Sequence, residues 1–322
     1  MSQELRAFFI SLIEVAILAA AMVGLVYVGI PIDPEHYFAG SLIQTELLEN
    51  TPGPRIILAG GSNVALGLDA ELMQRTLGLP VINDGLHAGL GVVPLRELKE
   101  YIRAGDVIIL SLEYTMFSSR EVMEGDTAFL ADWIEFAPRR TAYLFDPWTE
   151  APGIYATMLQ RKVNRQLNTF LHHGSLEEVR AIFEGESFDA NGDFIGHIKE
   201  NVKPMTKIPD QPYPVVRQDD EIFIFLEDFR QFAQDRGATV YFEAPASRQT
   251  NCLATGETQM ENFFKTFKTR SSIPLITPLN QVCMADKYFF DTAYHLNAQG
   301  RRIRTKLLIE NLLRLNVVPV QQ

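Results

Sequence analysis

Short apolar runs alternate with segments of helical pattern along most of this chain, and this alternation constrains its fold more than any other feature. Each run has the length and composition of a buried strand: RIILAG (55–60), PVIN (80–83), DVIILSLE (106–113), ATVYFEAP (238–245) and IPLIT (273–277). Helical segments separate the runs, and Asp69 and Gly78 predict the start and the end of the first of these helices. Such alternation predicts an α/β fold built on a parallel sheet.

We therefore expect a three-layer αβα domain over residues 55–322, with a mostly parallel sheet of about five strands. Further helices are expected near 94–103, 219–236, 256–271 and 297–315. Residues 115–215 interrupt the alternation and are rich in helix formers and aromatic residues, which predicts a helical insertion. Residues 33–54 are expected to form a short amphipathic stretch followed by a linker containing proline and glycine.

The segment from Ala7 to Ile32 is apolar apart from a single charged residue, Glu14. A helix of this length rises about 39 Å, which exceeds the roughly 30 Å hydrocarbon core of a bilayer. We expect residues 1–32 to be an uncleaved transmembrane anchor; a cleaved signal peptide and a buried helix remain the alternatives. Arg6 before the span and Asp33 after it favour an inside N-terminus and an extracytoplasmic main domain, hence a single-pass membrane protein in contact with the lipid bilayer.

Composition and charge exclude some functions. The formal net charge of −11 argues against nucleic acid as a partner, because phosphate binding requires a basic face. No P-loop, no GxGxxG motif and no Cys/His cluster is present, so we expect no cofactor and no metal site. The two cysteines, Cys252 and Cys283, are candidates for a disulfide in an exported domain and for free thiols in the cytosol.

Three short motifs follow predicted strands or precede the last helix, where open α/β sheets place ligands. Gly60-Gly61-Ser62-Asn63 follows the first strand and is either an exposed nucleophile beside free backbone N–H groups or a tight turn with a capping serine. Asn83-Asp84-Gly85-Leu86-His87 follows the second strand, and the glycine allows a backbone N–H to approach a ligand. Asp291-Thr292-Ala293-Tyr294-His295 precedes the last helix and supplies either an oriented imidazole base or only loop and cap residues.

The order of these motifs resembles that of the SGNH (GDSL-like) hydrolase and acyltransferase superfamily, over residues 55–113 and 219–315. The resemblance implies a flavodoxin-like three-layer fold with Ser62 as the nucleophile, His295 as its base and Asp291 as the acid. It also implies that the Gly85 N–H contributes to the oxyanion hole.

The chain departs from the family pattern in two ways. The family usually spaces its acid and base as D-x-x-H, whereas Asp291 and His295 are four residues apart. The family usually has an asparagine after the third strand as an oxyanion donor, whereas this chain has Glu113, and an ionised carboxylate would repel the oxyanion. Asn63 is then a candidate donor to the oxyanion, and Glu113 either has another role or abolishes the activity.

Anchored members of this superfamily modify polymers of the cell envelope. The resemblance implies an extracytoplasmic O-acyltransferase or esterase that acts on an envelope glycan through an acyl-enzyme on Ser62. It also implies a multi-spanning membrane-bound O-acyltransferase, or another membrane complex, as a partner. The alternatives are a plain esterase for small or lipid esters and a non-catalytic accessory subunit on an SGNH-like scaffold.

Overall fold

A computed structural model describes residues 3–29, 32–118, 120–143, 151–171, 183, 185–199, 208, 212–213 and 221–317. Its central sheet has four parallel strands in the order β2-β1-β3-β4. Their bounds are Ile56–Gly60 for β1, Val81–Gly85 for β2, Val107–Ser111 for β3 and Thr239–Phe242 for β4. The predicted parallel α/β architecture is confirmed. The run IPLIT, predicted as a fifth strand, contributes only one parallel bridge, between Leu275 and Phe242, because the chain leaves the sheet edge on either side of it.

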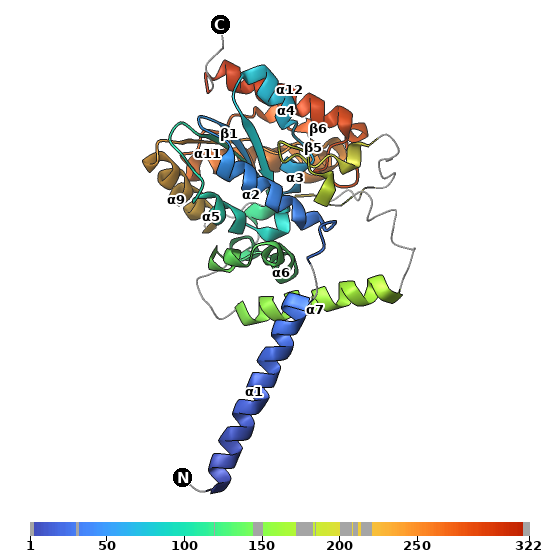
Figure 1. The fold of residues 1–322 in the computed structure, drawn as a ribbon. Helices are drawn as coiled ribbons and strands as arrows, with labels where there is room; N and C mark the ends of the chain where they lie inside the picture. The colour runs from blue at the N-terminus through green and yellow to red at the C-terminus, as the bar shows by residue number, and fades with distance from the viewer. Residues whose placement is uncertain are drawn as a thin grey trace.

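Helices cover both faces of the sheet, as Figure 1 shows. The helices are α1 (Gln3–Gly29), α2 (Gly40–Asn50), α3 (Ser62–Ala65), α4 (Ala70–Leu77), α5 (Val93–Leu98), α6 (Thr127–Phe136), α7 (Ala151–Leu171), α9 (Glu221–Asp235), α10 (Gln249–Thr255), α11 (Glu257–Arg270) and α12 (Ala298–Arg314). Alternate residues of each strand point to opposite faces. Ile56 and Leu58 of β1 therefore pack with α4 and α12, whereas Ile57 and Ala59 pack in the cluster that includes α2, α5 and α9.

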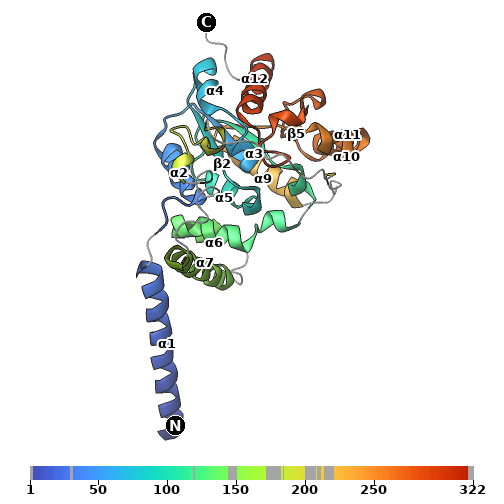
Figure 2. The ribbon, with the colours of Figure 1, turned by 90° about the vertical axis from the view of Figure 1, so that its right-hand side faces the viewer.

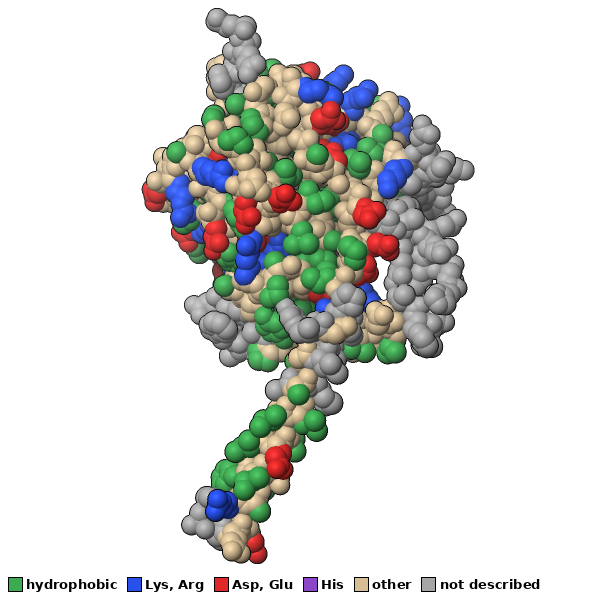
Figure 3. Space-filling view, in the orientation of Figure 1, with side chains coloured by type: hydrophobic (Ala, Val, Ile, Leu, Met, Phe, Trp, Pro, Cys, Tyr) green, Lys and Arg blue, Asp and Glu red, His purple; other side chains and the backbone are tan. Residues whose placement is uncertain are grey.

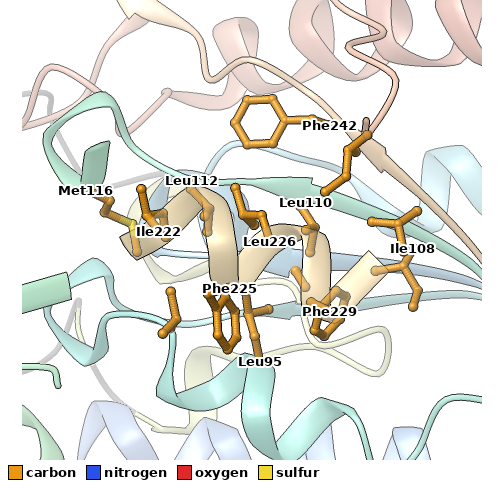
Figure 4. Packing of buried hydrophobic residues seen from close by; sticks show 14 of the residues in the cluster. Leu95, Ile108, Leu110, Leu112, Met116, Ile222, Phe225, Leu226, Phe229 and Phe242 are labelled. Carbon is orange, nitrogen blue, oxygen red and sulfur yellow. The ribbon is translucent and has the colours of Figure 1, made fainter. Parts of the chain in front are cut away.

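The larger hydrophobic cluster lies between β3 and the helices α5 and α9. Figure 4 shows Phe225, Leu226 and Phe229 of α9 next to Leu95 of α5, with Ile108 and Leu110 of β3 nearby. Apart from Phe225, which is 9% exposed, these side chains are at most 3% exposed. Burying one such side chain stabilises the fold by about 1.5–3 kcal/mol. The packing of α5 and α9 on this face of the sheet therefore holds the strands, and with them the strand ends, in position.

The helix ends that were predicted from the sequence are present. The Asp69 side chain caps α4 by accepting a hydrogen bond from the Leu72 N–H at 2.9 Å. Gly78 ends α4 at a φ of 70°, which a residue with a side chain rarely adopts. Asn297 caps α12 by accepting from the N–H groups of Gln299 and Gly300.

The segment 33–54, expected to be a linker, belongs to the domain over most of its length. Residues 40–50 form α2, which packs against β2 and contributes Leu48 to the core. The Gln44 side-chain amide donates to the carbonyl of Asn83 at 3.2 Å and to that of Gly85 at 2.6 Å. The expectation of a linker missed this packing because the polar Gln44 is buried and donates its hydrogen bonds to the carbonyls at the end of β2.

The insertion predicted over 115–215 is helical over most of residues 114–143 and over 151–171, whereas residues 185–199 form an irregular segment with short 3-10 turns. Its helices α6 and α7 lie side by side below the sheet, as Figure 2 shows. Asp132 of α6 accepts hydrogen bonds at 2.9 Å from both Arg161 and Arg165 of α7. These ion pairs hold α7 to the body of the molecule. Residues 144–150, 172–182 and most of 200–220 lie outside the described residues.

The predicted membrane anchor is wrong. Residues 3–29 form the single helix α1, which extends away from the body and contacts α7 (Figures 1 and 2). Apolar side chains are exposed along it, as Figure 3 shows. Glu4, Arg6 and Glu14 interrupt its first half, and no helix among the described residues is long and apolar enough to cross a membrane. The expected single-pass membrane localisation, with an inside N-terminus and an extracytoplasmic body, is overturned with it.

A disulfide joins Cys252 of α10 to Cys283 of β6 (Cys283–Met284), which pairs with β5 (Ser247–Arg248). Of the two alternatives left open for the cysteines, the structure contains the bridge. The bridge closes a loop with a sequence separation of 31 residues between α10 and the segment that leads to His295.

Replacing both cysteines by alanine is expected to lower the free energy of unfolding by about 2–4 kcal/mol, because the unfolded chain loses a cross-link. Urea unfolding followed by circular dichroism measures the change. Wild-type protein treated with a reductant is the control and should show a similar loss. An unchanged unfolding midpoint in the double variant would show that the bridge does not restrain the unfolded chain.

Candidate active site

The register of the sheet brings the ends of three strands to one edge. Gly60 of β1 lies opposite Gly85 of β2 on one side and opposite Ser111 of β3 on the other. Ser62 lies two residues after Gly60, the last residue of β1, and Glu113 lies two residues after Ser111, the last residue of β3. The carboxyl edge of an open parallel sheet is where ligands bind in this architecture. The candidate residues from distant parts of the sequence therefore meet at one place.

The turn that carries Ser62 depends on two glycines. A Cβ on Gly60 would lie 2.2 Å from the Ser111 carbonyl oxygen, and a Cβ on Gly61 would lie 3.0 Å from Ala88. Gly61 caps α3, so Ser62 is the first residue of that helix. The amides of a first helical turn have no partner within the helix. The hydrogen bonds among the described residues leave the Ser62 N–H unused, which makes it a donor available to a ligand.

Ser62, His295 and Asp291 form a continuous chain of hydrogen bonds. The Ser62 Oγ lies 2.8 Å from His295 Nε2, and His295 Nδ1 lies 2.7 Å from Asp291 Oδ1. Ser62 is 7% exposed, and the His295 and Asp291 side chains are 13% and 15% exposed. A carboxylate on Nδ1 fixes the proton there and leaves Nε2 free to accept the serine proton. This arrangement can activate a serine hydroxyl.

The four-residue spacing of Asp291 and His295 is accommodated by a tight loop. The Phe290 N–H donates to the His295 carbonyl at 2.8 Å, and Phe289 and Leu296 form an antiparallel bridge. Inside this loop, the Thr292 hydroxyl accepts from the His295 N–H at 3.0 Å. The extra residue therefore lies in a closed turn, and the contact between acid and base is kept.

A buried charge network lies beneath the serine turn. Arg304 of α12 donates to both carboxylate oxygens of Glu243, which follows β4, and to the Asn63 carbonyl at 2.6 Å. Ser111 donates to Glu243 at 2.6 Å. Arg304 and Glu243 are each 3% exposed, and buried charges are rare unless they are paired. Neither residue was predicted as part of the site, although a glutamate ending an apolar strand and an arginine on the apolar side of α12 are visible signals.

Residues 185–199 of the insertion also support the site. The Asp193 carboxylate accepts from Asn83 Nδ2 at 2.6 Å, from the Ala70 N–H at 2.8 Å and from Arg301 at 2.5 Å. His197 Nε2 lies 2.9 Å from the carbonyl of Leu296, the residue after His295. These contacts were not predictable, because both residues come from an irregular segment with no periodic pattern.

Asn63 and Gly85, the two predicted oxyanion donors, make other contacts. The Asn63 amide donates to Ser111 Oγ at 3.1 Å and to the Ser111 carbonyl at 3.2 Å, away from the Ser62 hydroxyl. The Gly85 N–H donates to Asn83 Oδ1 at 3.0 Å. Glu113, in contrast, lies beside the nucleophile, with its Oε1 3.4 Å from Ser62 Oγ. Its burial, at 8% exposure, raises the pKa of its carboxyl.

A small cavity adjoins the serine turn on the side of Ala88. Its volume is about 230 Å³, and it is lined by Ala88, Gly89, Gly91, Thr115, Met116, Val122 and Asp126. His87 borders this loop but is outside the hydrogen-bonded chain, since its Nδ1 accepts from the Gly89 N–H at 3.0 Å. Burial lowers the pKa of His87 to about 4, which keeps its ring neutral. Within the described residues, no group of three or more His, Cys, Asp or Glu side chains forms a metal site.

His197 should make stability depend on pH. Burial lowers the pKa of His197 to about 3, whereas its value in the unfolded chain is about 6.5. The unfolded chain therefore binds the extra proton between these values, and stability falls as the pH decreases. We expect the stability advantage of the wild type over His197→Gln to shrink by about 2 kcal/mol between pH 7 and pH 5. Urea unfolding at both pH values measures this, and a constant difference would contradict it.

Comparison with known proteins adds no assignment. No protein-family model matches the chain, and no curated protein matches it. The function must therefore be argued from the geometry of the site.

Proposed function

We propose that this protein is a serine-dependent esterase or O-acyltransferase of the SGNH type, in which Ser62 carries an acyl group as a covalent intermediate. The hydrogen-bonded chain from Ser62 through His295 to Asp291, with distances of 2.8 and 2.7 Å, carries this proposal. The position of the serine after β1 and of the histidine before the last helix supports it further.

The proposed reaction has two halves. In the first, Ser62 Oγ attacks the acyl carbonyl carbon, its proton moves to His295 Nε2, and Asp291 stabilises the imidazolium. The tetrahedral intermediate then expels the alcohol, which takes the proton from His295. In the second, His295 removes a proton from water or from an acceptor hydroxyl, whose oxygen attacks the acyl-serine. Ser62 regains its proton when the new acid or ester leaves.

The cavity beside Ala88 supports a short acyl group as the transferred unit. Sites for drug-sized ligands enclose about 300–1,000 Å³, and this cavity of about 230 Å³ is smaller. Met116 and Val122 close it with apolar side chains that are at most 6% exposed.

We further propose a glycan hydroxyl of the cell envelope as the acceptor. This part rests on the resemblance of the serine and histidine motifs to those of envelope-modifying proteins. Delivery of the acyl group by a membrane-bound O-acyltransferase stays a prediction.

A fluorophosphonate probe is expected to label the wild-type protein on Ser62. Ser62→Ala should abolish labelling, and His295→Ala should slow it on the order of 10³-fold, because the hydroxyl loses its base. Intact-protein mass spectrometry with peptide mapping measures the label. Ser272→Ala, which changes an exposed serine, is the matched control and should label normally. A folded wild type that takes up no probe would favour a non-catalytic scaffold.

The length of the acyl chain should determine the rate of ester hydrolysis. We expect p-nitrophenyl acetate to be cleaved about tenfold or more faster than the octanoyl ester in kcat/KM, since the small cavity excludes the longer chain. Met116→Ala should enlarge the cavity and reduce this preference. Equal rates for both esters in the wild type would show that the acyl group binds elsewhere.

A further inference from the structure

The carboxyl of Glu113 lies beside the nucleophile although it has no place in the chain from Ser62 to Asp291. Glu113 follows β3 and begins a short 3-10 helix, Tyr114–Phe117. Its Oε1 is 3.4 Å from Ser62 Oγ, and the residue is 8% exposed. A group so close to the reacting oxygen affects the charge that develops there.

The protons available at Ser62 constrain the state of Glu113. Asp291 holds the proton of His295 on Nδ1, so Nε2 is an acceptor and receives the single proton of the Ser62 hydroxyl at 2.8 Å. No proton of Ser62 is then left for Glu113. The Ser62 hydroxyl can donate to Glu113 Oε1 at 3.4 Å only when it does not donate to His295. While it donates to His295, a hydrogen bond between the two oxygens requires that Glu113 carry a proton and donate it.

The surroundings of Glu113 fit a neutral carboxylic acid. Its carboxyl is buried at the end of β3, with its Oε1 3.4 Å from the Ser62 hydroxyl. Burial is the largest influence on the pKa of Glu113 and raises it, which outweighs the opposing effects of the groups nearby. The titratable and charged groups that interact with it are His295, Arg304, Tyr37, Tyr213 and Tyr294.

The site also needs another oxyanion donor. Among the described residues the Ser62 N–H has no hydrogen-bond partner, whereas the Gly85 N–H donates to Asn83 and the Asn63 amide donates to Ser111. One donor is fewer than the two or more that commonly stabilise a tetrahedral intermediate. A hydroxyl on Glu113 would supply the second from the end of β3.

We propose that Glu113 acts as a neutral acid that donates a hydrogen bond to the oxyanion formed when Ser62 attacks the acyl carbonyl. This inference rests on the proposed function and names one more catalytic residue for it. The proton stays on Glu113 throughout, so no bond to Glu113 forms or breaks. An ionised Glu113 would repel the oxyanion, so activity should fall as the pH rises through the pKa of this residue.

Three variants test the proposal by their pH profiles. Glu113→Gln keeps a neutral donor of the same size and should retain kcat/KM for p-nitrophenyl acetate within about tenfold at neutral pH, while losing the alkaline decline of the wild type. Glu113→Leu removes the donor and should lose on the order of 10²–10³-fold in kcat. Glu97→Gln is the matched control, because Glu97 is also buried but pairs with Arg140, and it should keep the wild-type pH profile.

An infrared difference spectrum between the wild type and Glu113→Gln tests the protonation state without turnover. It should show the carbonyl stretch of a protonated carboxylic acid at neutral pH, and a carboxylate band in its place would overturn the proposal. Equal losses in the glutamine and leucine variants, or full activity of the leucine variant, would overturn the role of Glu113 while leaving the proposed function intact. Failure of the fluorophosphonate to label wild-type Ser62 would instead overturn the proposed function, and this role with it.

Discussion

The parallel register of β2, β1 and β3 is the constraint on which the candidate site depends. Gly60 pairs with both Gly85 and Ser111, so β1, β2 and β3 end side by side at the same edge of the sheet. Only glycine fits at Gly60, because a side chain there would collide with the Ser111 carbonyl. A slip of one residue in any strand would turn its side chains to the opposite face and separate Ser62 from Glu113. The buried face shared with α5 and α9 makes such a slip costly.

The register alone does not orient the base, because His295 comes from a loop outside the sheet. Arg304 provides the link, since it lies on the helix that follows the loop and donates to the Asn63 carbonyl next to the nucleophile. Its ion pair with Glu243 ties the same helix to the end of β4. Removing one partner of a buried pair typically costs 3–5 kcal/mol, because the other charge is left uncompensated. Nucleophile and base are therefore held by the same buried contacts that hold α12.

Local signals in the sequence were sufficient for most of the sheet and for the ends of α4 and α12, because a capping side chain acts on its own neighbours. Ser62, His295 and Asp291 were nominated by the resemblance of the motif order to the SGNH superfamily, because each motif taken alone left a turn or a cap open. The structure brings these three residues within hydrogen-bond distance. Local signals were insufficient where contacts with distant residues or with solvent determine how a segment packs. The apolar composition of residues 7–32 predicted an anchor that the structure contradicts. Residues 33–54 were expected to be an amphipathic stretch and a linker, and the packing of α2 within them was not foreseen because its buried polar contacts involve residues far away in the sequence.

The same distinction applies to Glu113. Judged by residue type, a glutamate at an oxyanion site is unfavourable, because the side chain is an anion in water. Judged by its surroundings, it is a buried carboxyl that faces the Ser62 hydroxyl, whose single proton can be donated to His295. Burial favours the neutral form of such a carboxyl, and the neutral form offers what an amide would offer, a hydrogen-bond donor. On the proposed role, Glu113 donates at the end of β3 the hydrogen bond that an amide side chain would donate there.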